Sequence, residues 1–146
     1  MKTIVKIIAI LLLCANGISA VFGGLHLIAD PSGSGLQMPL SFLEHSPFKS
    51  YLIPGIILLI VNGILSFITV ATILFKTSKY PLFIFAQGVL LTGWIIVQLI
   101  MLRVFYAPMH LTFVLIGITL IGCGLYLKIK MRWLPQRKSV KHLIIK

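Results

Sequence analysis

Four long apolar stretches, separated by short polar segments, occupy most of this chain of 146 residues. They cover residues 7–29, 54–75, 82–102 and 109–127. A helix rises about 1.5 Å per residue, so each stretch is long enough to cross a hydrocarbon layer about 30 Å thick. Small and polar residues recur at helical spacing within the stretches, as Asn16, Ala20 and Gly24 do in the first. The pattern predicts an all-α integral membrane protein folded as an antiparallel four-helix bundle.

The residues outside these spans are too few to form a second hydrophobic core. We therefore expect one membrane domain over 1–146, with a long loop over 30–53 and a basic tail over 128–146. Hydrophobic residues make up 59% of the chain and charged residues only 10%. Soluble domains carry roughly 25% charged residues, so the composition excludes a soluble fold.

The basic residues are distributed unequally between the two sides that the spans define. Eleven of the 13 Lys and Arg residues lie on the side of the N-terminus, the second connection and the tail. Lys49 and Arg103 lie on the opposite side with both acidic residues, Asp30 and Glu44. Short loops rich in Lys and Arg stay in the cytoplasm. We expect a multi-pass protein of the bacterial cell (inner) membrane with both termini in the cytoplasm.

The net charge of +11 follows this topology and does not indicate a nucleic-acid partner, because no soluble recognition fold is present. The tail over 128–146 interleaves basic and apolar residues, which favours contact with anionic lipid headgroups. Lys2 and Lys6 precede an apolar run in the manner of a signal peptide, but the run continues to Ala29 past a poor cleavage site. We expect this first helix to be retained.

Polar residues inside the spans predict a buried polar layer. At about 1.5 Å per residue, Asn16 and Asn62 both lie near the middle of the membrane, and Thr119 lies at a similar depth. We expect these three residues to join helices one, two and four through hydrogen bonds; a ligand site is the alternative interpretation. Other small or polar residues share the same helical faces: Gly55, Ser66, Thr69, Gln87 and Gly117.

A second group of polar residues is expected to converge at the outer ends of the helices. His26 and Asp30 end helix one, Gln98 and Arg103 end helix three, and His110 begins helix four. A histidine beside a carboxylate can perform acid–base chemistry, and two histidines from different helices can ligate haem or a metal. The alternative is that these side chains simply populate the headgroup region. The long loop nearby contains apolar residues and turn-forming Pro and Gly, so it forms either an interfacial connector or a lid.

Several kinds of chemistry lack the residues that they need. No Asp, Glu, Lys or Arg lies in the middle of a span, where coupled carriers commonly place an ionisable group. Cys14 and Cys123 are the only thiols and form no C-x-x-C motif. The chain contains no zinc signature or phosphate-binding glycine motif, and two acids cannot build a divalent metal cage. We predict no metal and no cofactor, and the catalytic residues, if any, stay unassigned.

A set of loop and packing motifs lies along the chain: Gly23-Gly24, Asp30-Pro31-Ser32-Gly33, Ser46-Pro47-Phe48, Ile53-Pro54-Gly55 and Gly93-Trp94-Ile95 followed by Gln98. These motifs resemble those of a widespread group of small, uncharacterised bacterial four-helix membrane proteins. The resemblance covers roughly residues 10–125 and implies no activity. A remote likeness to DoxX-type proteins rests on architecture alone.

Three functional hypotheses follow from this sequence. The first is a non-enzymatic accessory subunit that packs with itself or in a larger membrane complex. An exposed row of small residues in helix one would favour this hypothesis. The second is a protein that binds or passes a small neutral or lipid-like molecule, with Asn16, Asn62 and Gln98 as its polar lining. The third is a redox or haem-binding enzyme that uses His26 and His110.

Overall fold

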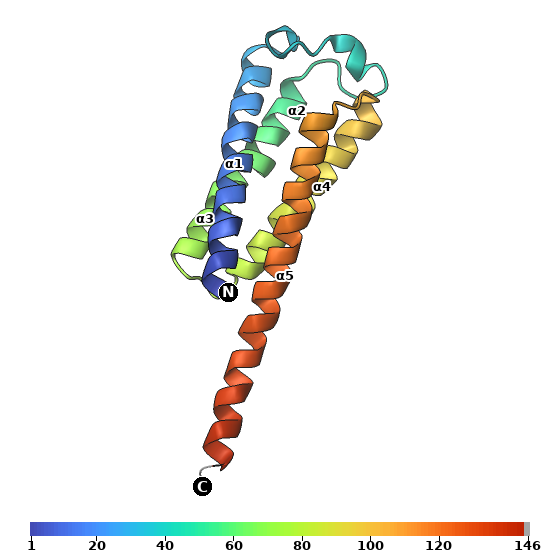
Figure 1. The fold of residues 1–146 in the computed structure, drawn as a ribbon. Helices are drawn as coiled ribbons and strands as arrows, with labels where there is room; N and C mark the ends of the chain where they lie inside the picture. Colours follow the sequence, from blue (N-terminus) through green and yellow to red (C-terminus); the bar gives the residue numbers. More distant parts are fainter. Residues whose placement is uncertain (145–146) are drawn as a thin grey trace.

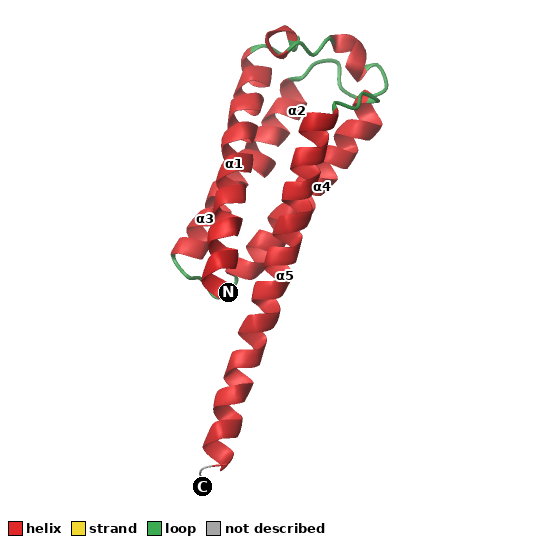
Figure 2. Ribbon diagram, viewed as in Figure 1, coloured by secondary structure: helices red, strands yellow, loops and turns green. Residues whose placement is uncertain are grey.

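The computed structural model describes the backbone of residues 1–144 and the side chains of residues 1–131. It is an all-α four-helix bundle, as predicted, and it contains no strand within residues 1–144 (Figures 1 and 2). The first span is α1 (Lys2–Ala29), the third is α4 (Tyr80–Leu102), and the fourth lies in the long helix α5 (Ala107–Ile144). The second span is continuous but changes its winding, from α2 (Leu52–Ile57) through the π-helix η3 (Leu58–Ile64) to α3 (Leu65–Leu74).

These helices have the length and hydropathy of membrane spans. The stretches that qualify are Lys2–Ala29, Leu52–Leu74, Tyr80–Leu102 and Ala107–Met131. Large apolar side chains such as Leu11, Ile18 and Leu115 are more than 60% exposed on the outside of the bundle. Such an apolar surface suits contact with lipid chains, and the fold is that of a multi-pass membrane protein.

The start of α1 and the C-terminal part of α5 lie at the same end of the bundle (Figure 1). We call this the terminal end, and we call the opposite end, which the loop between α1 and α2 covers, the loop end. The helix α5 continues beyond the other helices at the terminal end. The side chains of residues 132–146 lie outside the part of the chain that the structure describes, so lipid contact by the basic tail stays a prediction.

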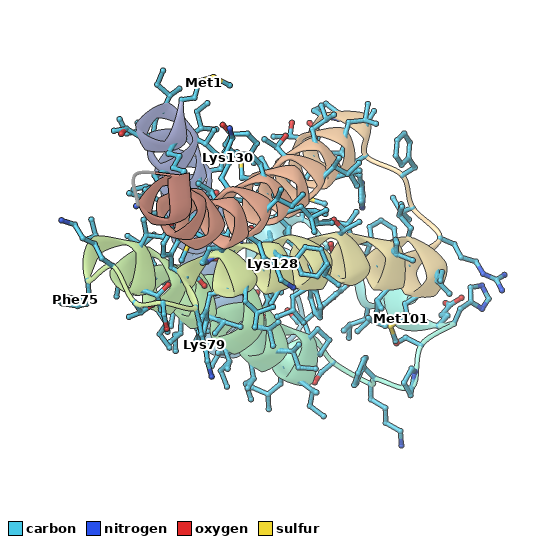
Figure 3. The ribbon with its side chains drawn as sticks, turned by 90° about the horizontal axis from the view of Figure 1, so that it is seen from below. Met1, Phe75, Lys79, Met101, Lys128 and Lys130 are labelled. Carbon is cyan, nitrogen blue, oxygen red and sulfur yellow. The ribbon has the colours of Figure 1, made fainter. Side chains whose placement is uncertain are left out.

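Basic side chains gather at the terminal end, which Figure 3 views along the bundle, with Lys79, Lys128 and Lys130 labelled there. Lys2 donates through Nζ to the backbone carbonyl of Lys130 at 3.3 Å. The ammonium of Lys6 lies 4.6 Å from the centre of the Tyr80 ring, within the range of a cation–π interaction. The N-terminal turn of α1 is thus tied to both α4 and α5.

Glycines pack the helices into two pairs. In the first pair, α1 contacts the second span so closely that a Cβ on Gly24 would lie 2.9 Å from the carbonyl oxygen of Gly55. In the second pair, a Cβ on Gly88 of α4 would lie 2.7 Å from the carbonyl oxygen of Gly117 in α5. Small residues permit this close approach of helix backbones, which strengthens van der Waals packing where lipid supplies no hydrophobic driving force.

The two pairs join through an apolar core toward the terminal end. Its buried residues come from both pairs, and the largest contribution is from α4 and α5. These residues are Ala9, Leu13, Ile73, Tyr80, Ile84, Leu120, Cys123 and Leu127. A second, smaller core at the loop end consists of Leu27, Leu43 and Tyr51. Between these two cores the helix pairs are separated by a cavity.

Candidate functional site

The cavity between the two helix pairs has two chambers. The deep chamber, of about 180 Å³, lies between α1, α4, η3 and the start of α5. Its lining is Asn16, Ser19, Ala20, Gly23, Leu27, Leu36, Met38, Leu58, Leu91, Trp94, Ile95, Gln98, Leu102, Met109 and Phe113. The upper chamber, of about 160 Å³, lies under the long loop. Its lining is Leu27, Met38, Leu43, Phe48, Tyr51, Pro54, Ile57, Trp94, Val97, Gln98, Met101 and Leu102.

The two chambers share a wall formed by Leu27, Met38, Trp94, Gln98 and Leu102. Both linings are mainly aliphatic and aromatic, and neither includes an Asp, Glu, Lys, Arg or His. Ligand sites in proteins are typically apolar cavities with a few polar groups that fix orientation. Here Gln98 is part of both linings, and Asn16 is part of the lining of the deep chamber.

The long loop lines the upper chamber at the loop end through Met38, Leu43, Phe48 and Tyr51. The ring of Tyr51 is 1% exposed, and its hydroxyl donates to the backbone carbonyl of Pro39 at 3.1 Å. Gly33 adopts a φ of 77°, and a Cβ there would lie 2.4 Å from the Met38 carbonyl oxygen and 2.7 Å from the Tyr51 ring. Only glycine fits this position, because it tolerates positive φ and has no side chain. The loop over residues 30–51 therefore packs over the upper chamber, and we call this loop the cover.

Asp30 organises the first turn of this cover. Its carboxylate accepts hydrogen bonds from the hydroxyls of Ser32 and Ser34, at 2.5 and 2.7 Å, and from the backbone N–H of Ser32 and Gly35. These donors stabilise the ionised form, so they hold the pKa of Asp30 well below its usual range. Asp30 is therefore a structural residue of the loop, with its acceptor positions already occupied.

A layer of buried amide and hydroxyl groups lies directly beneath the deep chamber. The Asn16 side chain donates through Nδ2 to the backbone carbonyl of Asn62 at 3.2 Å and to Ser66 Oγ at 2.9 Å. Ser66 Oγ in turn donates to the same Asn62 carbonyl at 2.7 Å. From α4, Gln87 Nε2 donates to the backbone carbonyl of Val61 at 3.0 Å. We call Asn16, Asn62, Ser66 and Gln87 the amide layer.

The amide layer is built around the π-helix of the second span. Leu65 donates its backbone N–H to the Ile60 carbonyl, five residues earlier, which is the spacing of a π-turn. The adjoining carbonyls of Val61 and Asn62 accept side-chain donors from α4 and α1. Short π-helical segments occur frequently at functional sites.

The structure brings Asn16 and Asn62 of the expected polar layer together but does not bring Thr119 to them. Thr119 is exposed on the outer surface of α5, and its hydroxyl donates to the Leu115 carbonyl of its own helix at 2.7 Å. Depth along the span places a residue at a level of the bundle, but it does not say toward which side the helix turns it. Gln87 and Ser66 take the place that we assigned to Thr119. Both lie on polar helical faces that the sequence revealed.

The five residues of the expected outer cluster do not converge. Gln98 lines the cavity, whereas Arg103 is exposed and ends α4 with a φ of 51°. His26 is exposed and its Nδ1 is 2.9 Å from the Phe22 carbonyl of its own helix. Asp30 is held in its serine turn, as described above. The side chains of His26 and Asp30 bond within their own helix end or turn, and none of these four residues hydrogen-bonds to another.

His110 is the one buried member of that expected cluster, at 3% exposure. Its Nδ1 lies 3.0 Å from the backbone nitrogen of Tyr106, and its ring stacks on Phe105 with ring centres 5.5 Å apart. It lines neither chamber. Within residues 1–131, no three His, Cys, Asp or Glu side chains are grouped so that they could hold a metal ion.

The fold and the cavity define a class: a four-helix multi-pass membrane protein with a cavity between its two helix pairs that no charged residue lines. Comparison with family models, curated proteins and solved structures found no match for this chain.

Proposed function

We propose that this protein binds a small, neutral, mainly apolar molecule in its two-chambered cavity. The observation that carries the proposal is the composition of the lining. Most of its side chains are apolar, none is charged, and a few are polar, among them Asn16, Ser19 and Gln98. Burying a charge in such a cavity would be costly without a partner, so the lining favours a neutral ligand. A molecule with a hydrocarbon body and one or two hydrogen-bonding groups matches this chemistry.

The structure gives less support to the two other hypotheses. The row of small residues in α1 is not an exposed surface, because Gly24 packs against Gly55 and Asn16 bonds within the chain. An accessory subunit would need a different contact surface. A haem enzyme would need two histidines facing one space, whereas His26 is exposed and His110 lines neither chamber.

We further propose that the loop end faces the outside of the cell membrane. The distribution of Lys and Arg supports this orientation, because eleven of the 13 lie at or beyond the terminal end. The cavity would then lie in the outer half of the bilayer, beneath its cover. Single cysteines at Ser34 and Lys79, in a background without Cys14 and Cys123, test the orientation. A membrane-impermeant maleimide added to intact cells should label position 34 and spare position 79; the reverse pattern would refute it.

Trp94 provides a direct readout of ligand binding, because it lines both chambers. The chain has two tryptophans, so Trp133→Phe leaves Trp94 as the only emitter. Bromine quenches indole fluorescence at close contact, and a bromo-substituted fatty alcohol therefore reports occupancy of the cavity. In detergent micelles we expect saturable quenching, at probe concentrations far below those that fill the micelle.

A matched control separates the cavity from the surrounding lipid. Ile96 is 49% exposed on the same helix and lines neither chamber. Ile96→Trp in a Trp94→Phe and Trp133→Phe background should show only gradual, non-saturable quenching. Gly23→Leu should fill the deep chamber and weaken binding, whereas Gly122→Leu, where nothing lies within 4 Å of an added Cβ, should not. Equal, non-saturable quenching at positions 94 and 96 would refute the proposal.

A further inference from the structure

The bonding pattern of the amide layer fixes how its amides are oriented. The Val61 carbonyl can only accept a hydrogen bond, so Gln87 must present Nε2 to it and turn Oε1 away. Ser66 Oγ donates to the Asn62 carbonyl and therefore offers a lone pair to Asn16, which must present Nδ2. The network thus determines these two orientations without reference to the hydrogen positions.

Three polar atoms of the layer have no partner in this arrangement. They are Asn62 Oδ1, Asn62 Nδ2 and Gln87 Oε1, and both residues are 0% exposed. Asn62 is notable because its backbone carbonyl accepts two hydrogen bonds while its side chain makes none. An unpaired amide within the hydrocarbon region is costly, and an apolar side chain would avoid the cost. The fold therefore leaves two acceptors and one donor of this layer without a hydrogen bond.

The free atoms specify the chemistry of the group that they can hold. Gln87 Oε1 only accepts, Asn62 Nδ2 only donates, and Asn62 Oδ1 only accepts. A group that bonds to both atoms of the Asn62 amide must donate and accept, which a hydroxyl does. The one hydrogen of a hydroxyl serves either Asn62 Oδ1 or Gln87 Oε1, whereas water has a hydrogen for each. An ammonium cannot accept and a carboxylate or phosphate cannot donate. No charged side chain lies among the residues of the layer to compensate an ion.

We infer that Asn62 and Gln87 form a binding site for a neutral hydroxyl group, supplied by the bound amphiphile or by water. Asn62 and Gln87 line neither chamber, but Asn16 lines the deep one and bonds to the Asn62 backbone carbonyl, so one residue separates the site from that chamber. The inference rests on the proposed function only where the amphiphile supplies the hydroxyl. The π-helix places the site at a point where α1, η3 and α4 meet.

Two probes of one chain length test the first source. In the Trp133→Phe protein, a bromo-substituted fatty alcohol should quench Trp94 at about fivefold lower concentration than the matching bromoalkane, the effect of about one hydrogen bond. Asn62→Leu should abolish this preference, so that the bromoalcohol and the bromoalkane quench at similar concentrations. That result supports the inference and names the amphiphile as the source.

Thermal unfolding without a probe tests water as the source. Asn62→Ser keeps a donor and an acceptor and leaves room for a hydroxyl, whereas Asn62→Leu keeps the number and branching of the side-chain heavy atoms and removes both. A higher Tm for the Ser variant than for the Leu variant supports the site, because simple packing predicts the reverse order. If Asn62→Leu is at least as stable as Asn62→Ser and leaves the preference of the probes unchanged, the inference is overturned. If neither probe saturates at Trp94, the proposed function fails, and the order of the two Tm values still decides this inference.

Discussion

Gly24 of α1 and Gly55 of α2 face each other where the first two spans cross. A Cβ on Gly24 would lie 2.9 Å from the Gly55 carbonyl oxygen, and one on Gly55 would lie 3.2 Å from the Gly24 carbonyl oxygen. The two backbones therefore touch directly. This crossing holds α1 against the second span at the level of the deep chamber, whose wall includes the neighbouring Gly23.

Gly24→Ala should destabilise the protein by about 1–3 kcal/mol, because the added methyl group meets backbone and Cβ atoms that cannot move aside cheaply. Those atoms are Leu59 Cβ, Leu59 N and the Gly55 carbonyl oxygen, all within 2.9 Å. Gly93→Ala is the matched control, because nothing lies within 4 Å of its added Cβ and it lies inside α4. The control should be neutral or stabilising by up to about 1 kcal/mol. Thermal unfolding in detergent measures both; equal Tm values for the two variants would contradict the close crossing.

The four spans were predictable because the bilayer restricts the chain to so few structures. Backbone groups in hydrocarbon must bond to each other, so an apolar stretch of about 20 residues has to be a helix. The ends were less predictable: α1 starts at Lys2 and α5 at Ala107, each before the apolar stretch begins. Polar residues such as Lys2 and Lys6 extend a helix beyond the hydrocarbon without breaking it. In α4 and α5, Pro81 and Pro108 occupy the first helical turn, where a missing N–H costs nothing.

The candidate site was only partly predictable, because it depends on how the helices rotate and pair. Hydropathy gives the depth of Asn16, Asn62 and Thr119, but only packing turned Thr119 outward. The residues of the expected outer cluster are separate for a related reason. His26 and Arg103 belong to the same end of the bundle, but a shared depth does not bring two side chains together. The cavity arises from the separation of two glycine-packed helix pairs, a relation among four helices that no single span encodes.

Asn16→Leu should destabilise the bundle by about 1–2 kcal/mol, because it removes two hydrogen bonds that join α1 to the second span. Thr119→Val is the control at a similar depth. Its hydroxyl bonds only within α5 and is exposed, so its loss should change stability by less than about 0.5 kcal/mol. Chemical unfolding in detergent compares the two. A larger effect at Thr119 than at Asn16 would show that the amide layer does not join the helices.

Tyr51→Phe should loosen the cover of the cavity while leaving its ring packing in place. The variant loses the hydrogen bond to the Pro39 carbonyl, which contributes about 1 kcal/mol in a typical case. Acrylamide in the aqueous phase should then quench Trp94 fluorescence more strongly in the double variant Tyr51→Phe and Trp133→Phe than in the single variant Trp133→Phe. Tyr106→Phe is the control, because Tyr106 is 63% exposed and lines neither chamber. Unchanged quenching after Tyr51→Phe would show that this bond does not hold the cover closed.

The cover should also depend on the ionisation of Asp30, in a pH range that the direction of its pKa shift defines. The folded turn lowers the pKa of Asp30 below its ordinary value of 3.8, so the turn favours the ionised carboxylate. A depressed pKa in the folded state gives stability that is fully present above about 3.8 and is lost as the pH falls toward the folded pKa. Protection of the loop from exchange should therefore be constant between pH 5 and 7 and should decline below that range, after correction for intrinsic exchange rates.

Asp30→Asn isolates this contribution at neutral pH. An amide keeps one acceptor oxygen, but its nitrogen cannot accept from the Ser34 hydroxyl or the Gly35 N–H that Asp30 Oδ2 now binds. We expect faster exchange at residues 32–38 and faster tryptic cleavage after the exposed Lys49. Glu44→Gln is the charge-matched control, because it removes the other acid of the same loop and should leave both rates unchanged. If Asp30→Asn and Glu44→Gln behave alike, the serine turn does not order the cover, and only the total charge of the loop matters.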